Sequence, residues 1–116
     1  MVGTHEVETL LDACGHKHRR IVLAVLTSRE RPVSIDDLTN AIIRHNHHTT
    51  PPETGDETVA QIRASLHHLH LPKLAETGFA RYDRERQTVE STPLVDREES
   101  RLSAILAMDA DLPPLE

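Results

Sequence analysis

The stretch that decides the expected fold is ETVAQIRASLHHLHLPKLAETG (residues 57–78). Its apolar residues recur at helical spacing, which predicts an amphipathic helix from residue 57 to about residue 71. The apolar face of that helix consists of Val59, Ile62, Leu66 and Leu69. Pro72 lacks a backbone donor, so we expect the helix to kink or restart there and to continue until Gly78 ends it.

A short hairpin is expected directly after this helix. The segments FARYD (79–83) and TVEST (88–92) have strand-like composition, and the polar segment RERQ (84–87) between them predicts a turn. The tip of the hairpin is therefore rich in charged side chains.

Three further helices are expected before this stretch. Apolar stripes predict helices over residues 7–14 and 16–28, with a glycine between them. Ser34 is a good N-cap for a third helix over residues 35–45, and residues 47–56 have the composition of a polar loop. The expected core faces are Val7, Leu10, Leu11 and Cys14; Ile21, Val22, Val25 and Leu26; and Leu38, Ala41 and Ile42.

A last helix is expected between residues 96 and 109, where apolar residues recur at near-helical spacing. This order of helices followed by a charged hairpin is typical of a winged helix-turn-helix domain, in which the helix from residue 57 is the recognition helix and the hairpin is the wing. The sequence therefore predicts a mainly α fold with a small β-hairpin. We expect a winged helix-turn-helix domain at 5–92, a C-terminal dimerisation helix at 93–110 and a tail at 111–116.

The composition restricts the class of protein. A chain of 116 residues with 37% hydrophobic residues can build one domain, and it lacks any apolar stretch near the ~20 residues that a bilayer crossing requires. The N-terminus has neither a positive leader nor an apolar segment, and Cys14 is the only cysteine, so a cytoplasmic location is expected. We find no nucleophile elbow, glycine-rich phosphate loop or acid–base pair of carboxylates, so no enzyme activity is expected.

The charge composition points to a particular medium. Asp and Glu number 19 against 13 Lys and Arg, the net charge is -6, and Lys17 and Lys73 are the only lysines. Acid-rich chains with few lysines and few aromatics suit a high-salt cytoplasm, where the Debye length falls to ~3 Å and an acidic surface is screened. A net negative charge therefore does not exclude nucleic acid as a partner.

Several segments carry a family resemblance. They are Arg19-Arg20 followed by Ile21-Val22-Leu23, VSIDDL (33–38), LHHLHLPKLAETG (66–78), Tyr82-Asp83 and Thr88-Val89. Together they resemble the small haloarchaeal winged-helix domain of unknown function over roughly residues 7–89, and the run that starts at residue 66 is the most specific part. The resemblance implies a winged-helix fold, a haloarchaeal source and a role in transcriptional regulation.

Double-stranded DNA is the expected partner, and two groups of side chains are candidates for binding it. Polar side chains on the solvent face of the recognition helix can pair with base edges or phosphates, and these are Gln61, Arg63, Ser65 and His68. Guanidinium groups on the hairpin can bind phosphate or enter a narrow minor groove, and these are Arg81, Arg84 and Arg86. The alternatives are an ordinary polar helix face and local pairing of the hairpin arginines with Asp83 and Glu85. Arg19 and Arg20 can supplement the hairpin or can instead bond carboxylates of a neighbouring helix.

A homodimer and, as an alternative, a protein partner are also predicted. The apolar side chains expected to form the dimer seam are Leu102, Ile105, Leu106 and Met108, joined by Val7, Leu10 and Leu11. The alternative for these residues is packing onto their own domain. Asp56 and Glu57 at the start of the recognition helix repel phosphates, which favours a module that binds protein and no DNA.

The nine histidines allow a metal site only on loose spacing. Such a site would draw on His67 and His70 together with His45, His47 and His48, but no recognisable motif or cysteine partner supports it, so we expect no metal and no other cofactor. We expect His70 to hydrogen-bond a buried backbone carbonyl freed by Pro72, and His68 to be exposed. Cys14 is expected to be a buried small hydrophobic residue.

Overall fold

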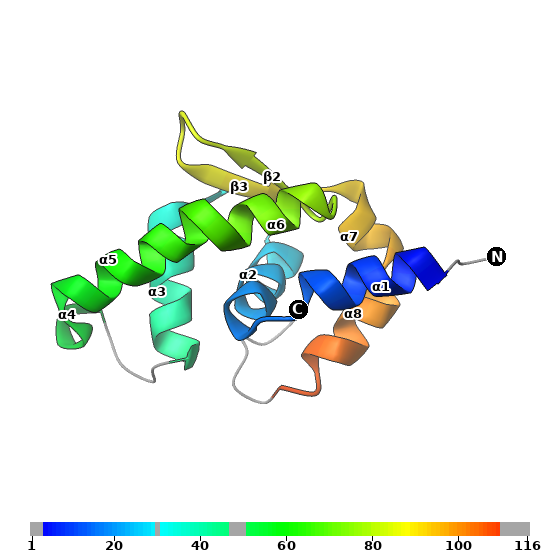
Figure 1. The fold of residues 1–116 in the computed structure, drawn as a ribbon, viewed down its shortest axis with the longest axis horizontal. Coiled ribbons are helices and arrows are strands. Elements are labelled where there is room, and N and C mark those ends of the chain that lie inside the picture. The colour runs from blue at the N-terminus through cyan, green and yellow to red at the C-terminus, as the bar shows by residue number, and fades with distance from the viewer. Residues whose placement is uncertain (1–3, 30, 47–50, 110–116) are drawn as a thin grey trace.

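The structure is a computed structural model, and it describes residues 4–29, 31–46 and 51–109. Its elements in chain order are α1 (Thr4–Ala13), α2 (Lys17–Ser28), β1 (Val33–Ser34), α3 (Ile35–Asn46), α4 (Pro51–Thr54), α5 (Asp56–Ser65), the π-helical turn η1 (Leu66–His70), α6 (Leu71–Glu76), β2 (Ala80–Asp83), β3 (Thr88–Ser91), α7 (Pro93–Arg97) and α8 (Glu99–Leu106). The fold is mainly helical with a small antiparallel sheet of three strands, which is consistent with winged-helix topology (Figure 1). No helix in the described ranges is long and apolar enough to cross a membrane.

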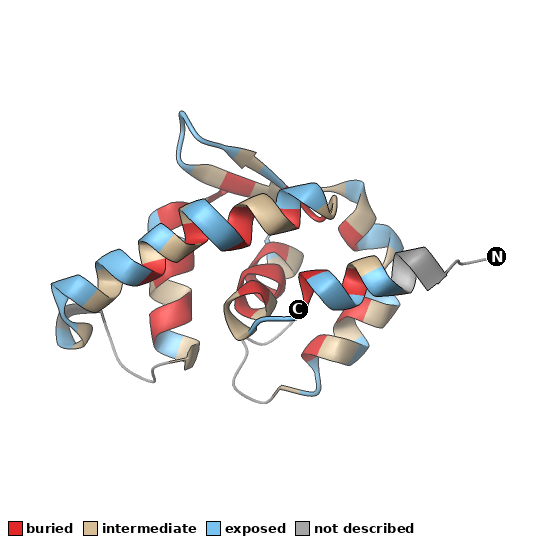
Figure 2. Cartoon of the chain, viewed as in Figure 1, coloured by how far each residue is buried: buried red, intermediate tan, exposed pale blue. Residues whose placement is uncertain are grey.

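The core is built around α2. Every residue from Ile21 to Leu26 is buried, so this helix is covered on all sides rather than along the single stripe that the sequence predicts. Figure 1 shows α5, η1 and α6 as a continuous rod that passes over α2 and α3, and Figure 2 shows the buried residues gathered where these helices meet. The long rod is therefore fixed to the core along its inner face only.

The expected hairpin is confirmed, and the sheet has one more strand than expected. β2 and β3 pair antiparallel with Tyr82 opposite Val89, and β1 adds to the other side of β3 with Val33 opposite Val89. The predicted N-cap of α3 is also confirmed, because Ser34 Oγ accepts a hydrogen bond from the backbone N–H of Asp37 at 3.0 Å. β1 thus anchors the base of the hairpin to the start of α3.

The first helix departs from its predicted apolar stripe. Leu10 and Cys14 are buried as expected, whereas Leu11 is 56% exposed. The side chain of Val7 lies outside the described part of the chain. The structure therefore corrects Leu11 from a core residue to a surface residue, because α1 is a peripheral helix with one narrow buried face.

The π-helical turn η1 changes which residues of the rod face the core. The backbone N–H of Leu71 donates to the carbonyl of Leu66, one residue further than in an α-helix. This extra residue turns His70 and Leu71 into the core and leaves Leu69 52% exposed. The prediction that Leu69 belongs to the apolar face is therefore wrong. The adjustment expected at Pro72 occurs in the turn before it, and Pro72 itself lies in the first turn of α6, where no N–H donor is needed.

Gly78 ends the rod as predicted, in a left-handed conformation with φ of 89°. The N–H of Phe79 donates to the carbonyl of Leu74 at 3.0 Å, and the N–H of Gly78 donates to that of Ala75 at 3.1 Å. These two bonds form a Schellman cap, which turns the chain into β2 and delivers the buried Phe79 to the core.

Gly78→Ala is expected to lower the free energy of unfolding by about 1–2 kcal/mol, because an alanine is strained at positive φ. Its Cβ would also lie 3.3 Å from Cδ2 of Leu94. Urea denaturation followed by circular dichroism measures the effect. Gly55→Ala is the matched control, because Gly55 has φ of 94° and open space around its Cβ position. A loss no greater than in this control would show that the contact with Leu94 costs nothing.

Candidate nucleic-acid interface

The hairpin holds its charged tip in a defined shape. Asp83 Oδ1 accepts the backbone N–H groups of Glu85 and Arg86, each at 3.1 Å, and Gln87 adopts a left-handed conformation with φ of 55°. The N–H of Ile35 donates to the carbonyl of Gln87 at 2.9 Å, which ties the end of the turn to α3. The turn residues are therefore placed by hydrogen bonds at both ends.

All three predicted hairpin arginines are exposed, and their local partners are weak. Arg81 Nη1 lies 3.2 Å from Glu90 Oε1, and Arg86 Nε lies 3.9 Å from Asp83 Oδ2. The guanidinium carbon of Arg84 lies 5.7 Å from the centre of the Tyr82 ring, at cation–π distance. Because exposed ion pairs contribute about 1 kcal/mol or less, these arginines can exchange their partners for an incoming anion.

The residues predicted for the recognition helix differ in their exposure and in whether they have a partner within the chain. Gln61 and His68 are exposed, and Ser65 is half-buried. Arg63 forms an ion pair with Asp36 of α3, so its charge is partly neutralised within the chain. Sequence alone could not reveal this pairing, because it joins two helices far apart along the chain.

Two residues outside the predicted set, His67 and Tyr82, connect the rod to the hairpin. A hydrogen bond joins Nδ1 of His67 to the hydroxyl of Tyr82, so η1 and β2 are held together at this point. His67 and Tyr82 line a shallow depression with His68, Arg84 and Gln87. Burial lowers the pKa of His67, as do the nearby charges of Arg63, His68 and Arg84, which favours the neutral imidazole in this hydrogen bond. The placement of Tyr82 on the first hairpin strand was the available signal.

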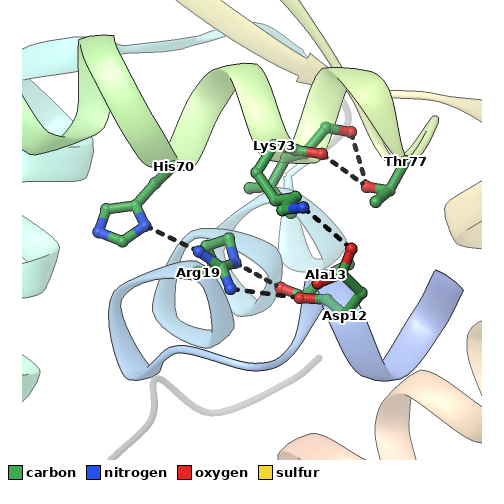
Figure 3. Close-up of polar contacts among 7 residues, drawn as sticks. Asp12, Ala13, Arg19, His70, Lys73 and Thr77 are labelled. Carbon is green, nitrogen blue, oxygen red and sulfur yellow. Dashed lines mark hydrogen bonds and ion pairs between the residues drawn. The ribbon is translucent and has the colours of Figure 1, made fainter. Parts of the chain in front are cut away.

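Arg19 and Arg20 are not part of this surface, which corrects their suggested role in binding phosphate. Arg19 is 9% exposed, and its Nε and Nη2 donate to the carbonyls of Ala13 and Asp12 at 3.1 and 3.2 Å (Figure 3). Arg20 Nη1 donates to the carbonyl of Cys14 at 2.8 Å. Both guanidinium groups therefore satisfy carbonyls at the C-terminal end of α1, where cations are favoured. Arg20 also has a carboxylate partner, since its Nε lies 3.6 Å from Asp109 Oδ2, but Asp109 follows α8 and is not part of a neighbouring helix.

The histidines are arranged differently from the loose grouping considered above. His45 is half-buried at the end of α3, and His47 and His48 lie outside the described residues. His70 is buried, and its ring accepts a hydrogen bond at Nδ1 from Nη1 of Arg19 at 3.3 Å instead of donating one to a backbone carbonyl (Figure 3). The expected partner of His70 is therefore wrong, because η1 turns this ring toward α2.

Of the remaining predicted residues, some are buried in the core and others are exposed at the surface. Cys14 is buried as expected, and burial raises the pKa of its thiol to about 11. Leu102 and Leu106 are buried within this chain, at 0% and 2% exposed, which corrects their place in a dimer seam. The physical reason is that α8 packs back onto its own domain, with Asp109 paired to Lys17 and Arg20 of α2. Ile105 is half-buried and Met108 is 86% exposed, so these two keep surface for a second copy.

The fold places this protein in the structural class of small, mainly helical domains with a three-stranded antiparallel sheet. Within that class the chain belongs to the family described as a domain of unknown function, DUF7344, which matches residues 11–90. The match includes the rod and nearly all of the hairpin. No curated protein and no solved structure matches this chain.

Proposed function

We propose that this protein is a winged-helix transcriptional regulator that binds double-stranded DNA sequence-specifically as a dimer, and that its source is a haloarchaeon. The observation that carries the proposal is the exposed group of Arg81, Arg84 and Arg86 on a hairpin whose turn is held by hydrogen bonds. A pre-shaped turn loses little conformational entropy when it binds, so the guanidinium groups can fork onto phosphates or into a narrow minor groove.

The outer face of the rod supports the same function. Gln61 and His68 are exposed and can reach base edges, and the exposed residues Ala60 and Ala64 between them are small enough for close approach to a groove. The bond between His67 and Tyr82 joins the rod to the hairpin beside this face. In this proposal the hairpin positions the protein on phosphates, and the helix face reads the sequence.

The second copy in this proposal docks beside α1 and α8. A depression between them is lined by Leu11, Cys14, Arg20, Ile105, Met108 and Asp109. Leu11 and Met108 are the large apolar side chains exposed there. In this proposal they contact the second copy, whereas Leu102 and Leu106 are buried and do not.

Arg84→Ala combined with Arg86→Ala is expected to weaken DNA binding about tenfold or more. Each lost phosphate contact should also reduce the slope of log affinity against log salt by about 0.9. Fluorescence anisotropy with labelled duplexes selected from genomic DNA, repeated at several KCl concentrations, measures both quantities. The control is Arg44→Ala combined with Arg97→Ala, which removes two exposed arginines outside the hairpin and changes the net charge equally. An equal loss in both double variants would contradict the role of the hairpin.

A module that binds protein and no DNA is the second candidate function, favoured by the acidic start of the rod. Asp56 and Glu57 are exposed in the first turn of α5, and Asp36 neutralises Arg63 nearby. An acidic face of this kind suits a basic protein surface. Failure of the wild-type protein to bind any selected duplex at low salt would favour this function over DNA binding.

A further inference from the structure

Three histidine side chains from two separate segments of the chain converge beside the buried end of Arg19. His16 is the N-cap residue of α2, His18 lies in the first turn of α2, and His70 closes η1. The ring centres of His16 and His70 are 4.4 Å apart, those of His16 and His18 are 4.9 Å apart, and those of His18 and His70 are 5.5 Å apart. One ring nitrogen from each residue lies within 4.8 Å of the others.

We propose that His16, His18 and His70 bind a single Zn²⁺ ion or a chemically similar first-row divalent cation, which joins the start of α2 to the π-helical turn η1. Imidazole nitrogen is a preferred ligand of zinc, nickel and copper, whereas magnesium and calcium prefer the carboxylate oxygens that this group does not contain. Three protein ligands leave a fourth position for water.

The rings are held by hydrogen-bond contacts in the metal-free protein, and ligation exchanges some of these contacts, because a ligating imidazole carries its proton on the nitrogen that does not bind the metal. His16 Nδ1 accepts the backbone N–H of His18 at 3.0 Å, so the proton of this ring is on Nε2 in the metal-free protein. Ligation through Nε2 moves the proton to Nδ1 and gives up the bond to His18. Nε2 of His18 lies 3.2 Å from Nδ2 of Asn46, so α3 also helps to hold the site. Each of the three rings therefore has a hydrogen-bond contact in the metal-free protein.

The three imidazole rings have to move slightly closer together to bind one ion. Zinc–nitrogen bonds of about 2.0–2.1 Å in tetrahedral geometry place the ligand nitrogens about 3.4 Å apart, compared with the 4.8 Å limit observed. His16 is exposed and His18 is half-buried, so both can rotate toward the fixed ring of His70. Exposure of His16 also gives the metal a path of entry and a place for the water ligand.

At neutral pH two of the three imidazoles are in the neutral form that ligation requires. Burial lowers the pKa of His16 and that of His70, the latter to about 4, and neighbouring positive charges act in the same direction. Both imidazoles are therefore neutral, the state that binds metal. In the metal-free protein Arg19 donates to Nδ1 of His70, so the proton of that ring is on Nε2. Binding through Nε2 moves this proton to Nδ1 and breaks the contact with Nη1 of Arg19, whose bonds to Ala13 and Asp12 remain.

Titration of chelator-stripped protein, purified without a histidine tag, with Zn²⁺ in an isothermal calorimeter tests the site. We expect one equivalent to bind and the midpoint of thermal unfolding to rise with free Zn²⁺. His16→Ala is expected to weaken binding by about tenfold or more while the protein still folds, because this ring is exposed. His68→Ala is the control, since it removes an exposed imidazole from the same π-helical turn outside the cluster.

Substitution with Co²⁺ gives a second readout that does not depend on stability. Wild-type protein and His68→Ala are expected to show the visible absorption of tetrahedral cobalt, and His16→Ala and His18→Gln to lose it. Zinc binding by His16→Ala with wild-type affinity would overturn the proposal, and so would binding of several equivalents without a defined stoichiometry. Neither measurement uses DNA, so the outcome is independent of the function proposed above.

Discussion

Arg19→Met is expected to lower the free energy of unfolding by about 3 kcal/mol. Methionine keeps the apolar length of the side chain but removes every donor of the buried guanidinium. The carbonyls of Ala13 and Asp12 then lose their bonds of 3.1 and 3.2 Å, and His70 loses its contact at 3.3 Å. These carbonyls lie at the C-terminal end of α1, where the helix dipole favours a positive charge.

Chemical denaturation of the metal-free protein at neutral pH measures this loss. Arg29→Met is the matched control, because Arg29 is exposed and its ion pair with Asp37 spans 3.5 Å in solvent. The control is expected to change the free energy of unfolding by less than about 0.5 kcal/mol. Equal effects of the two substitutions would mean that the guanidinium of Arg19 does not hold α1 to α2.

Much of the fold is predictable from local sequence signals. The helices before the rod, the N-cap at Ser34 and the cap at Gly78 all depend on residues a few positions apart, and each is found, although Leu11 and Leu69 are exposed and not part of the core. β1 was not predicted, because its residues Val33 and Ser34 are too few to show a strand pattern. Its pairing with β3 depends on residues more than fifty positions away, which no local pattern encodes.

The errors along the rod have one cause. Sequence periodicity assumes a constant helical repeat, and η1 inserts one extra residue into it. Beyond that insertion Leu69 turns outward and His70 turns inward. The adjacent Pro72 indicated an irregularity but not its position, which is why His70 was expected to bond a backbone carbonyl and not Arg19.

The candidate sites show the same division between local and distant information. The exposed arginines of the hairpin follow from turn composition alone. The pairing of Arg63 with Asp36 and the burial of Arg19 depend on how helices pack, so both escaped prediction. The cluster of His16, His18 and His70 escaped it for the same reason, since more than fifty residues separate its two segments.

Acidification is expected to destabilise the metal-free protein through His70. Its pKa is lowered from 6.5 to about 4 in the folded state, chiefly by burial and then by the charges of His16, His18 and Arg19 that face it. A group with a lowered folded pKa stabilises the protein above its unfolded pKa, and this stability is lost as pH falls from 6.5 toward about 4. Between about pH 7 and pH 5 the loss from His70 amounts to about 2 kcal/mol.

Denaturation of the wild type and of His70→Gln in chelator across this pH window isolates that contribution, because glutamine can still accept a bond from Arg19 but does not titrate. We expect a lower stability for the variant at neutral pH and a shallower pH dependence, so that the two curves converge on acidification. His68→Gln removes an exposed imidazole from the same turn and is expected to keep the wild-type slope. Parallel curves for wild type and His70→Gln would mean that His70 is not held neutral. The window lies above the usual range of carboxyl titration, so a difference in slope belongs to the buried ring and its contact with Arg19.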